Sequence, residues 1–231
     1  FVFYQYLQPG YRVRLKHLLI LLLALITIFL FRNYVLVALL PAMFTMLLCK
    51  IFSLKRRWVI AGCYALFITM FFLSGLLNNS FNLPQAVVNR KADFARLEKG
   101  TTDLPMNELT PDLIGFAQNI PQAINHTLFR PYLWESGNIL VALAAMELFF
   151  YQCLFVLAML TLLRKQKPLH DFTIFSVLFF ITMMLIIGYT IPNAGAIVRY
   201  RGILWLFILC PLIGNIDWGK LIGFLRKKAL Q

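Results

Sequence analysis

The sequence predicts an all-α fold, a polytopic transmembrane helical bundle of about six spans with a partly helical outer loop. Of the 231 residues, 61% are hydrophobic and only 13% are charged. A soluble domain carries about 45–50% apolar and about 25% charged residues, so this composition excludes an ordinary water-soluble protein. Phenylalanine alone contributes 22 residues, and the apolar surface that no single core of this size can hide must face lipid.

Six apolar runs mark the predicted spans, because a helix that rises 1.5 Å per residue needs about 20 residues to cross about 30 Å of hydrocarbon. The runs are residues 17–31, 34–49, 58–77, 138–163, 172–191 and 203–216. The first two are short and are separated only by Arg32 and Asn33. As one helix they would run about 50 Å with an arginine near the middle, so we expect a tight helical hairpin. The sixth run is short and contains Pro211, which leaves open a spanning helix or a re-entrant segment.

The distribution of basic residues predicts the orientation of the bundle. Segments that would share one side carry 14 of the 22 lysines and arginines, at residues 12–16, 50–57, 164–167 and 220–228. Positive residues concentrate in cytoplasmic loops, so we expect both termini in the cytoplasm. Membrane orientation and contact with anionic lipid account for the net charge of +13, and no nucleic-acid partner is expected.

Four parts follow along the chain. An N-terminal three-span unit covers residues 1–77, an outer, periplasmic loop 78–137, a C-terminal three-span unit 138–216, and a cytoplasmic amphipathic tail 217–231. In the loop, one amphipathic helix is expected after Pro84 and another after Thr110-Pro111-Asp112, where a capping residue, a first-turn proline and an acid coincide. The start at Phe1, without the features of a signal peptide, leads us to expect the C-terminal part of a longer protein. No cysteine or histidine spacing indicates a metal site, and no cofactor is expected.

Glu147 is the strongest single candidate for chemistry. It lies roughly ten residues into the fourth predicted span, where a carboxylate costs about 2.5–3.5 kcal/mol unless it is paired, protonated or hydrated. We therefore expect it to face the bundle interior, with Gln152 on roughly the same side. It is either a general acid or base, proton relay or substrate contact, or a buried acid that fixes helix packing.

The segment IPNAGAIVRYRG, residues 191–202, is a second candidate. Pro-Asn predicts a turn, and small residues let backbones approach closely. Arg199 and Arg201 then lie near the outer interface, where they either hold a diphosphate headgroup or extend to lipid phosphates. Both arginines point the same way if the segment is extended, and they diverge by about 200° if it is helical.

The segment LFRPYLWESGN, residues 128–138, is the third candidate. Tyr132 and Trp134 are typical anchors at the membrane interface. Arg130 and Glu135 would face the same outer vestibule as Arg199 and Arg201, and His126 is a candidate base, although a lone histidine in a loop is usually solvated.

Two of these segments resemble polytopic bacterial inner-membrane proteins that are associated with surface-polysaccharide assembly, of the O-antigen or exopolysaccharide kind. In that group an FRP…WE stretch enters a helix carrying a glutamate, and a later span adjoins an N-G-VRYR segment before a PL or PF helix. The matched residues, over about a fifth of the chain, are Phe129, Arg130, Pro131, Trp134, Glu135, Glu147, Asn193, Gly195, Val198, Arg199, Tyr200 and Arg201.

The resemblance implies a metal-independent glycosyltransferase or polymerase that acts at the outer face on a polyprenyl-diphosphate-linked glycan. Arg199, Arg201 and Arg130, with Asn193 and Tyr200, would bind the diphosphate. Glu147 or Glu135 would assist glycosyl transfer or orient the acceptor. Two alternatives stay open, a non-catalytic subunit with protein partners in a membrane complex, and a transporter or flippase that couples through Glu147. Membrane lipids are partners in every case.

Overall fold

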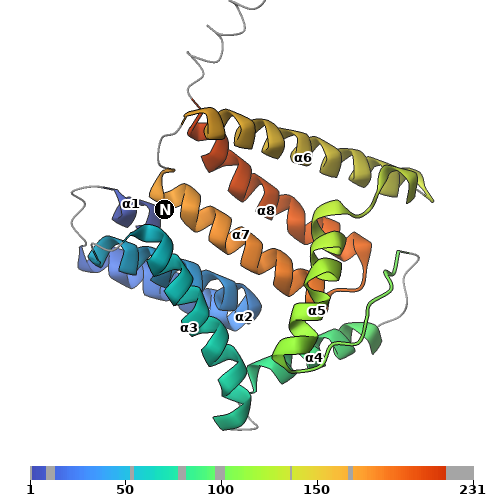
Figure 1. Cartoon of the computed structure of the whole chain (residues 1–231), viewed down its shortest axis with the longest axis horizontal. Coiled ribbons are helices and arrows are strands. Elements are labelled where there is room, and N and C mark those ends of the chain that lie inside the picture. The colour runs from blue at the N-terminus through green and yellow to red at the C-terminus, as the bar shows by residue number, and fades with distance from the viewer. Residues whose placement is uncertain are drawn as a thin grey trace, which may run out of the picture.

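Five helices in the described part of the chain are long and apolar enough to cross a bilayer, so this is an integral membrane protein (Figure 1). The computed structural model describes residues 2–8, 14–52, 55–77, 82–96, 102–135, 137–165 and 169–216. The elements in order are α1 (Val2–Leu7), α2 (Leu15–Ile51), α3 (Arg56–Leu77), α4 (Leu83–Arg96), α5 (Leu113–Ile124), the π-helical turn η2 (Asn125–Phe129), the 3₁₀ turn η3 (Leu133–Glu135), α6 (Ile139–Lys165), α7 (Asp171–Thr190) and α8 (Ala194–Gly214). The predicted all-α class is confirmed.

Helix α2 folds back on itself at Arg32, whose φ of −148° and ψ of 63° are not helical. Before it, α1 contacts α2 and packs Tyr4 on Phe172 near the first residue of α7. After it, Arg56 pairs with Asp171 at the same end of α7, whereas Arg32 itself lies against Tyr200 at the opposite end. A straight helix of 37 residues would be about 55 Å long and could not satisfy all three contacts. The two arms form the predicted hairpin, and with each arm taken as one pass the five helices correspond to the six predicted spans.

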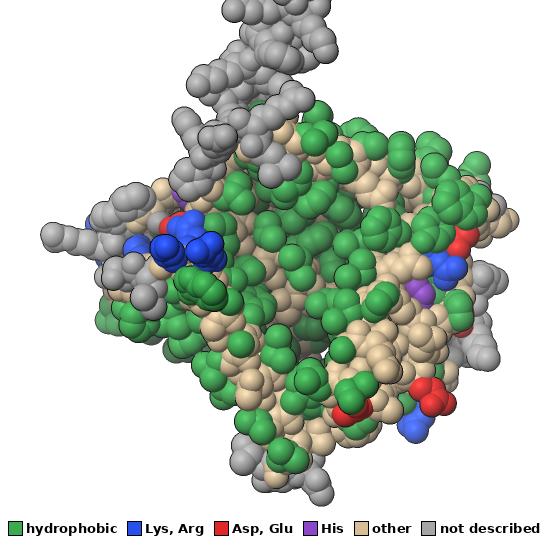
Figure 2. Space-filling view, viewed as in Figure 1, with side chains coloured by type: hydrophobic (Ala, Val, Ile, Leu, Met, Phe, Trp, Pro, Cys, Tyr) green, Lys and Arg blue, Asp and Glu red, His purple; other side chains and the backbone are tan. Residues whose placement is uncertain are grey.

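Helix α7 is the centre of the bundle. It contacts α2, α4, α5 and α8, and it is apolar all round, so that its remaining exposed residue, Ile181, is also apolar. Its buried side chains include Phe175, Phe179, Phe180, Met183, Met184 and Ile187. By contrast, α2, α3 and α6 expose most of their apolar residues, and Figure 2 shows hydrophobic side chains over much of the visible face. These exposed apolar faces are where lipid replaces water as the solvent.

Helix α8 begins at Ala194, nine residues before the sixth predicted span, and continues through Pro211 to Gly214. The Asn193 side chain caps it by accepting a hydrogen bond from the Ala196 N–H at 3.1 Å. At 21 residues, α8 is long and apolar enough to cross fully, which favours the spanning alternative over the re-entrant one. Apolar run length missed the first turns because they carry two arginines and two glycines.

The two ends of the bundle differ in composition, and we name them for it. At the basic end lie Lys50, Arg56 and Asp171. At the cap end lie α4, α5 and the segment 102–112, in contact with the last turns of α7. Basic segments and the loop are therefore at opposite ends, as the charge pattern predicts. The predicted amphipathic tail, residues 217–231, lies outside the described residues.

Helix α5 crosses α7 at close range because residue 188 is glycine. A Cβ atom at Gly188 would collide with the Ala123 backbone. One residue on, the Tyr189 hydroxyl donates to the Phe116 carbonyl at 3.0 Å. The N-cap of α5 is Asp112, two residues beyond the start predicted at Thr110, and its carboxylate accepts from the Gly115 N–H at 3.3 Å. The Thr110 hydroxyl, as a hydrogen-bond donor, lowers the pKa of Asp112.

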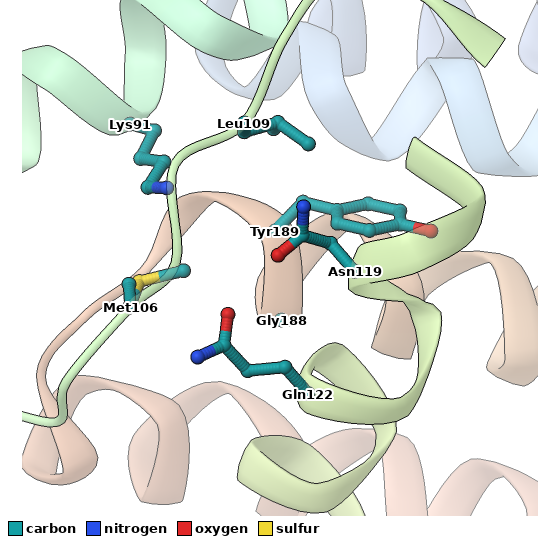
Figure 3. Close-up of a pocket in the computed structure, with 7 residues that line it drawn as sticks. All are labelled: Lys91, Met106, Leu109, Asn119, Gln122, Gly188 and Tyr189. Carbon is teal, nitrogen blue, oxygen red and sulfur yellow. The ribbon is translucent and has the colours of Figure 1, made fainter. Parts of the chain in front are cut away.

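Two side-chain amides of α5, those of Asn119 and Gln122, hydrogen-bond to the preceding segment, residues 102–112 (Figure 3). Asn119 donates to the carbonyls of Glu108 at 3.1 Å and Gly115 at 2.8 Å. Gln122 accepts from the Asn107 N–H and donates to the Pro105 carbonyl, each at 3.1 Å. The space between these groups, with Lys91, Met106, Leu109 and Tyr189 around it, leaves no room for a water molecule. The pocket in Figure 3 is therefore a packing seam, not a ligand site.

Candidate functional site

A cluster of polar side chains lies at the cap end, where η2, η3 and α6 meet α8. Its centre is Arg201, which is only 3% exposed although it carries a charge. One guanidinium nitrogen donates to the Thr127 carbonyl at 3.4 Å and also to the Arg130 carbonyl. A buried charge needs such partners, because leaving water without them costs several kcal/mol. The carbonyls of the turn after α5 thus replace the solvation of Arg201.

Arg130 and Glu135 form an ion pair across the loop beside Arg201. Their ion pair measures 2.8 Å, and the other Glu135 oxygen accepts from the Tyr132 N–H at 3.2 Å. The Tyr132 hydroxyl donates to the Asn125 side chain at 2.5 Å, and its ring stacks on Trp134 with centroids 4.7 Å apart. The charge of Arg130 is therefore met within the protein, and its Nε atom is buried without a partner among the described residues.

Glu147 lies on the exposed side of α6, contrary to the expectation that it faces the interior. Its carboxylate accepts from the Tyr151 hydroxyl at 2.8 Å, and it is close enough for its charge to act on Arg201. The Tyr151 ring stacks on Trp205 of α8 at 6.0 Å. Among the described helices α6 packs on α8 and η3, so its buried side is narrow and is occupied by Ala145 and Leu148. Glu147 flanks that side, at its rim.

Gln152 does face inward, as expected, and its amide donates to the Leu128 carbonyl at 2.5 Å. His126 differs from the expectation of a solvated histidine, because it is only 3% exposed. Its Nδ1 atom has no partner among the described residues. Burial lowers the pKa of His126, the charge of Arg130 lowers it further, and Glu135 opposes both. His126 is therefore a neutral imidazole at pH 7.

The two arginines of the VRYR segment do not converge. The segment is helical, so Arg199 is exposed on one face of α8 while Arg201 is buried on another. Asn193 has a structural role. Its side-chain oxygen caps α8, and its amide nitrogen donates to the Asp103 carboxylate at 3.0 Å. Tyr200 lies away from the cluster, with its ring 5.7 Å from the guanidinium carbon of Arg32.

Of the predicted site residues, the structure brings together Arg130, Glu135, Glu147 and Arg201, and it separates Arg199, Asn193 and Tyr200 from them. Sequence reasoning missed Tyr151 and Trp205 as members of the cluster. The spacing of Glu147 and Tyr151 by four residues, one helical turn, was a signal for the first. Trp205 carried no such signal, because its position depends on how α8 packs against α6.

No protein-family model, curated protein or solved structure matches the chain. No group of three or more histidine, cysteine or acidic side chains within the described ranges could hold a metal ion. The cluster offers one accessible carboxylate, Glu147, beside the buried cation of Arg201.

Proposed function

We propose that this protein takes part in cell-surface polysaccharide assembly in a bacterial inner membrane and acts on a polyprenyl-diphosphate-linked glycan at the outer face. The observation that carries the proposal is the accessibility of Glu147. It is a carboxylate at the level of the membrane that the protein does not bury, and Tyr151 orients it. The resemblance of residues 129–152 and 191–212 to polysaccharide-assembly proteins supports the pathway. In the proposed orientation the basic end faces the cytoplasm, so the cluster lies toward the outer side.

In this proposal Glu147 is the general base of glycosyl transfer. A hydroxyl of the acceptor sugar attacks the anomeric carbon of the donor, and the bond from that carbon to the diphosphate oxygen breaks. The hydroxyl proton passes to Glu147, and the polyprenyl diphosphate leaves with the electron pair.

The arginines take different parts from those that the resemblance implies. Arg201 and Arg130 donate to or pair with protein groups, so their part is to hold η2 and η3 against α8. Arg199 is exposed at the cap end of α8, which leaves its guanidinium open to a phosphate group.

Replacement of Glu147 by glutamine tests the proposal, because the amide oxygen can still accept from Tyr151 but cannot take a proton. We expect Glu147→Gln cells to lose long surface glycan, measured by gel electrophoresis, at normal amounts of the protein in the membrane. Glu108→Gln is the matched control, since Glu108 is an exposed glutamate of the cap outside the cluster. Normal glycan length in both variants would contradict a catalytic role.

A non-catalytic subunit is the second candidate, and the outer face of α6 favours it. Around Glu147 this helix exposes Leu140, Leu143, Met146, Phe149 and Phe150. A partner helix that covered this face would supply a donor to Glu147. A photocrosslinking residue at position 146 would then capture one defined protein, and it would capture only lipid if the face meets the bilayer.

A further inference from the structure

A cavity of about 200 Å³ lies between α2, α7 and α8, apart from the Glu147 cluster. Phe179 and Met183 of α7 and Phe207 of α8 form part of its wall, which is almost wholly apolar. Ile203, which is 74% exposed, also lines it, so the cavity opens on the lipid-facing surface. Its volume is below the roughly 300–1,000 Å³ of small-molecule sites, and it suits part of one hydrocarbon chain.

Arg32 lines the same cavity and places a positive charge beside it. Its guanidinium donates to the Tyr34 hydroxyl at 3.0 Å and lies 5.7 Å from the centre of the Tyr200 ring. The side chain is exposed, and no carboxylate of the described ranges forms an ion pair with it. Arg32 is thus an oriented cation at the reversal of α2, where the chain leaves the apolar layer at the cap end.

We infer that the cavity and Arg32 together bind one anionic phospholipid of the leaflet at the cap end. The headgroup phosphate accepts hydrogen bonds from the Arg32 guanidinium, and part of one acyl chain fills the space between α7 and α8. Arginine matches phosphate in charge and in the geometry of its donors. The apolar wall matches the chain, and the opening at Ile203 lets a lipid enter sideways from the bilayer. This inference does not depend on the proposed function.

Native mass spectrometry of the delipidated full chain in detergent tests the inference, with phosphatidylglycerol and phosphatidylcholine as probes. We expect the wild type to bind phosphatidylglycerol more tightly. Arg32→Gln should weaken that binding roughly tenfold or more, since a hydrogen bond to a charged group is worth about 1.5–3 kcal/mol. Arg90→Gln is the matched control, because Arg90 is an exposed arginine of α4 at the same end that does not line the cavity. It should bind as the wild type does.

A second variant, Ile203→Trp, tests the cavity without changing charge, because an indole at this opening obstructs the chain. It should reduce binding as Arg32→Gln does. Equal affinity for the two lipids, or equal losses in Arg32→Gln and Arg90→Gln, would overturn the site. Polyprenyl phosphate is the third probe, and if it displaces phosphatidylglycerol at equal concentration, the occupant is an isoprenoid lipid and the phospholipid assignment is wrong.

Discussion

At the scale of single residues, Arg199 and Arg201 show how about half a turn of helix separates two like side chains. Both belong to the same VRYR motif, and both were expected at one anion site. Arg201 instead meets carbonyls of the turn after α5, whereas Arg199 points away from the cluster, exposed. Arg201 stabilises the structure, whereas Arg199 is accessible to a ligand. Replacing them should therefore have different effects on stability.

Arg201→Ala should lower the stability of the protein by about 2–4 kcal/mol, because it leaves two buried carbonyls without a donor and opens a cavity. Arg199→Ala should change it by no more than about 0.5 kcal/mol, as expected of an exposed position. The midpoint of thermal unfolding in detergent measures both. Similar midpoints for the two variants would show that the buried contacts of Arg201 contribute little.

Burial of His126 makes the stability of the folded protein depend on pH. Its pKa in the folded state is below the ordinary value of 6.5, so below that pH the unfolded chain binds more protons than the folded one. Above pH 6.5 His126 is neutral in both the folded and the unfolded state and costs no stability. As the pH drops from 6.5 through the folded pKa, protonation of the unfolded chain lowers the stability of the folded state. Between pH 7.5 and pH 5.5 the unfolding midpoint of the wild type should therefore fall more than that of His126→Gln. Equal falls would assign the dependence to other groups.

At the scale of elements, the crossing of α5 over α7 depends on one glycine. Two helices approach this closely only where a side chain is missing, and Gly188 provides that gap against Ala123. The sequence predicted both helices, with the cap of α5 misplaced by two residues. It did not predict their crossing, because nothing in a local pattern records which glycine faces which neighbour.

Gly188→Ala should destabilise the protein by about 1–3 kcal/mol, because the added methyl group meets backbone that cannot yield easily. Gly62→Ala in α3 is the matched control, since a Cβ atom there would have no atom within 4 Å. That change should be neutral or stabilising, as alanine favours a helix over glycine by up to about 1 kcal/mol. Thermal unfolding compares the two variants, and a stable Gly188→Ala protein would refute the close crossing.

At the scale of the whole molecule, the bundle has one end with basic residues and one end with the cap, and helices of both predicted three-span units pack on α7. The proposal for Glu147 requires the cap end to face outward. A cysteine-free variant with one cysteine added at Gln118, which is exposed in α5, should react with an impermeant maleimide from outside the cell. A cysteine at Lys55, exposed at the basic end, should react only after the membrane is opened. The reverse pattern would invert the topology and remove the proposal for Glu147.

The sequence by itself determined the class, the number of passes and the separation of basic segments from the loop. These follow from apolar run length, from the arginine between two short runs and from charge counts, all of which are local properties. The tertiary structure alone decided that Glu147 lies at the edge of the buried side of α6 and that His126 is buried. It also decided that Arg201 is buried and Arg199 exposed. The physical reason is that the bilayer restricts the length and the charge of every spanning helix, and both can be read from the local sequence. Which side of a helix is buried depends instead on the helices packed against it. Those neighbours, such as α8 beside α6, come from distant parts of the chain.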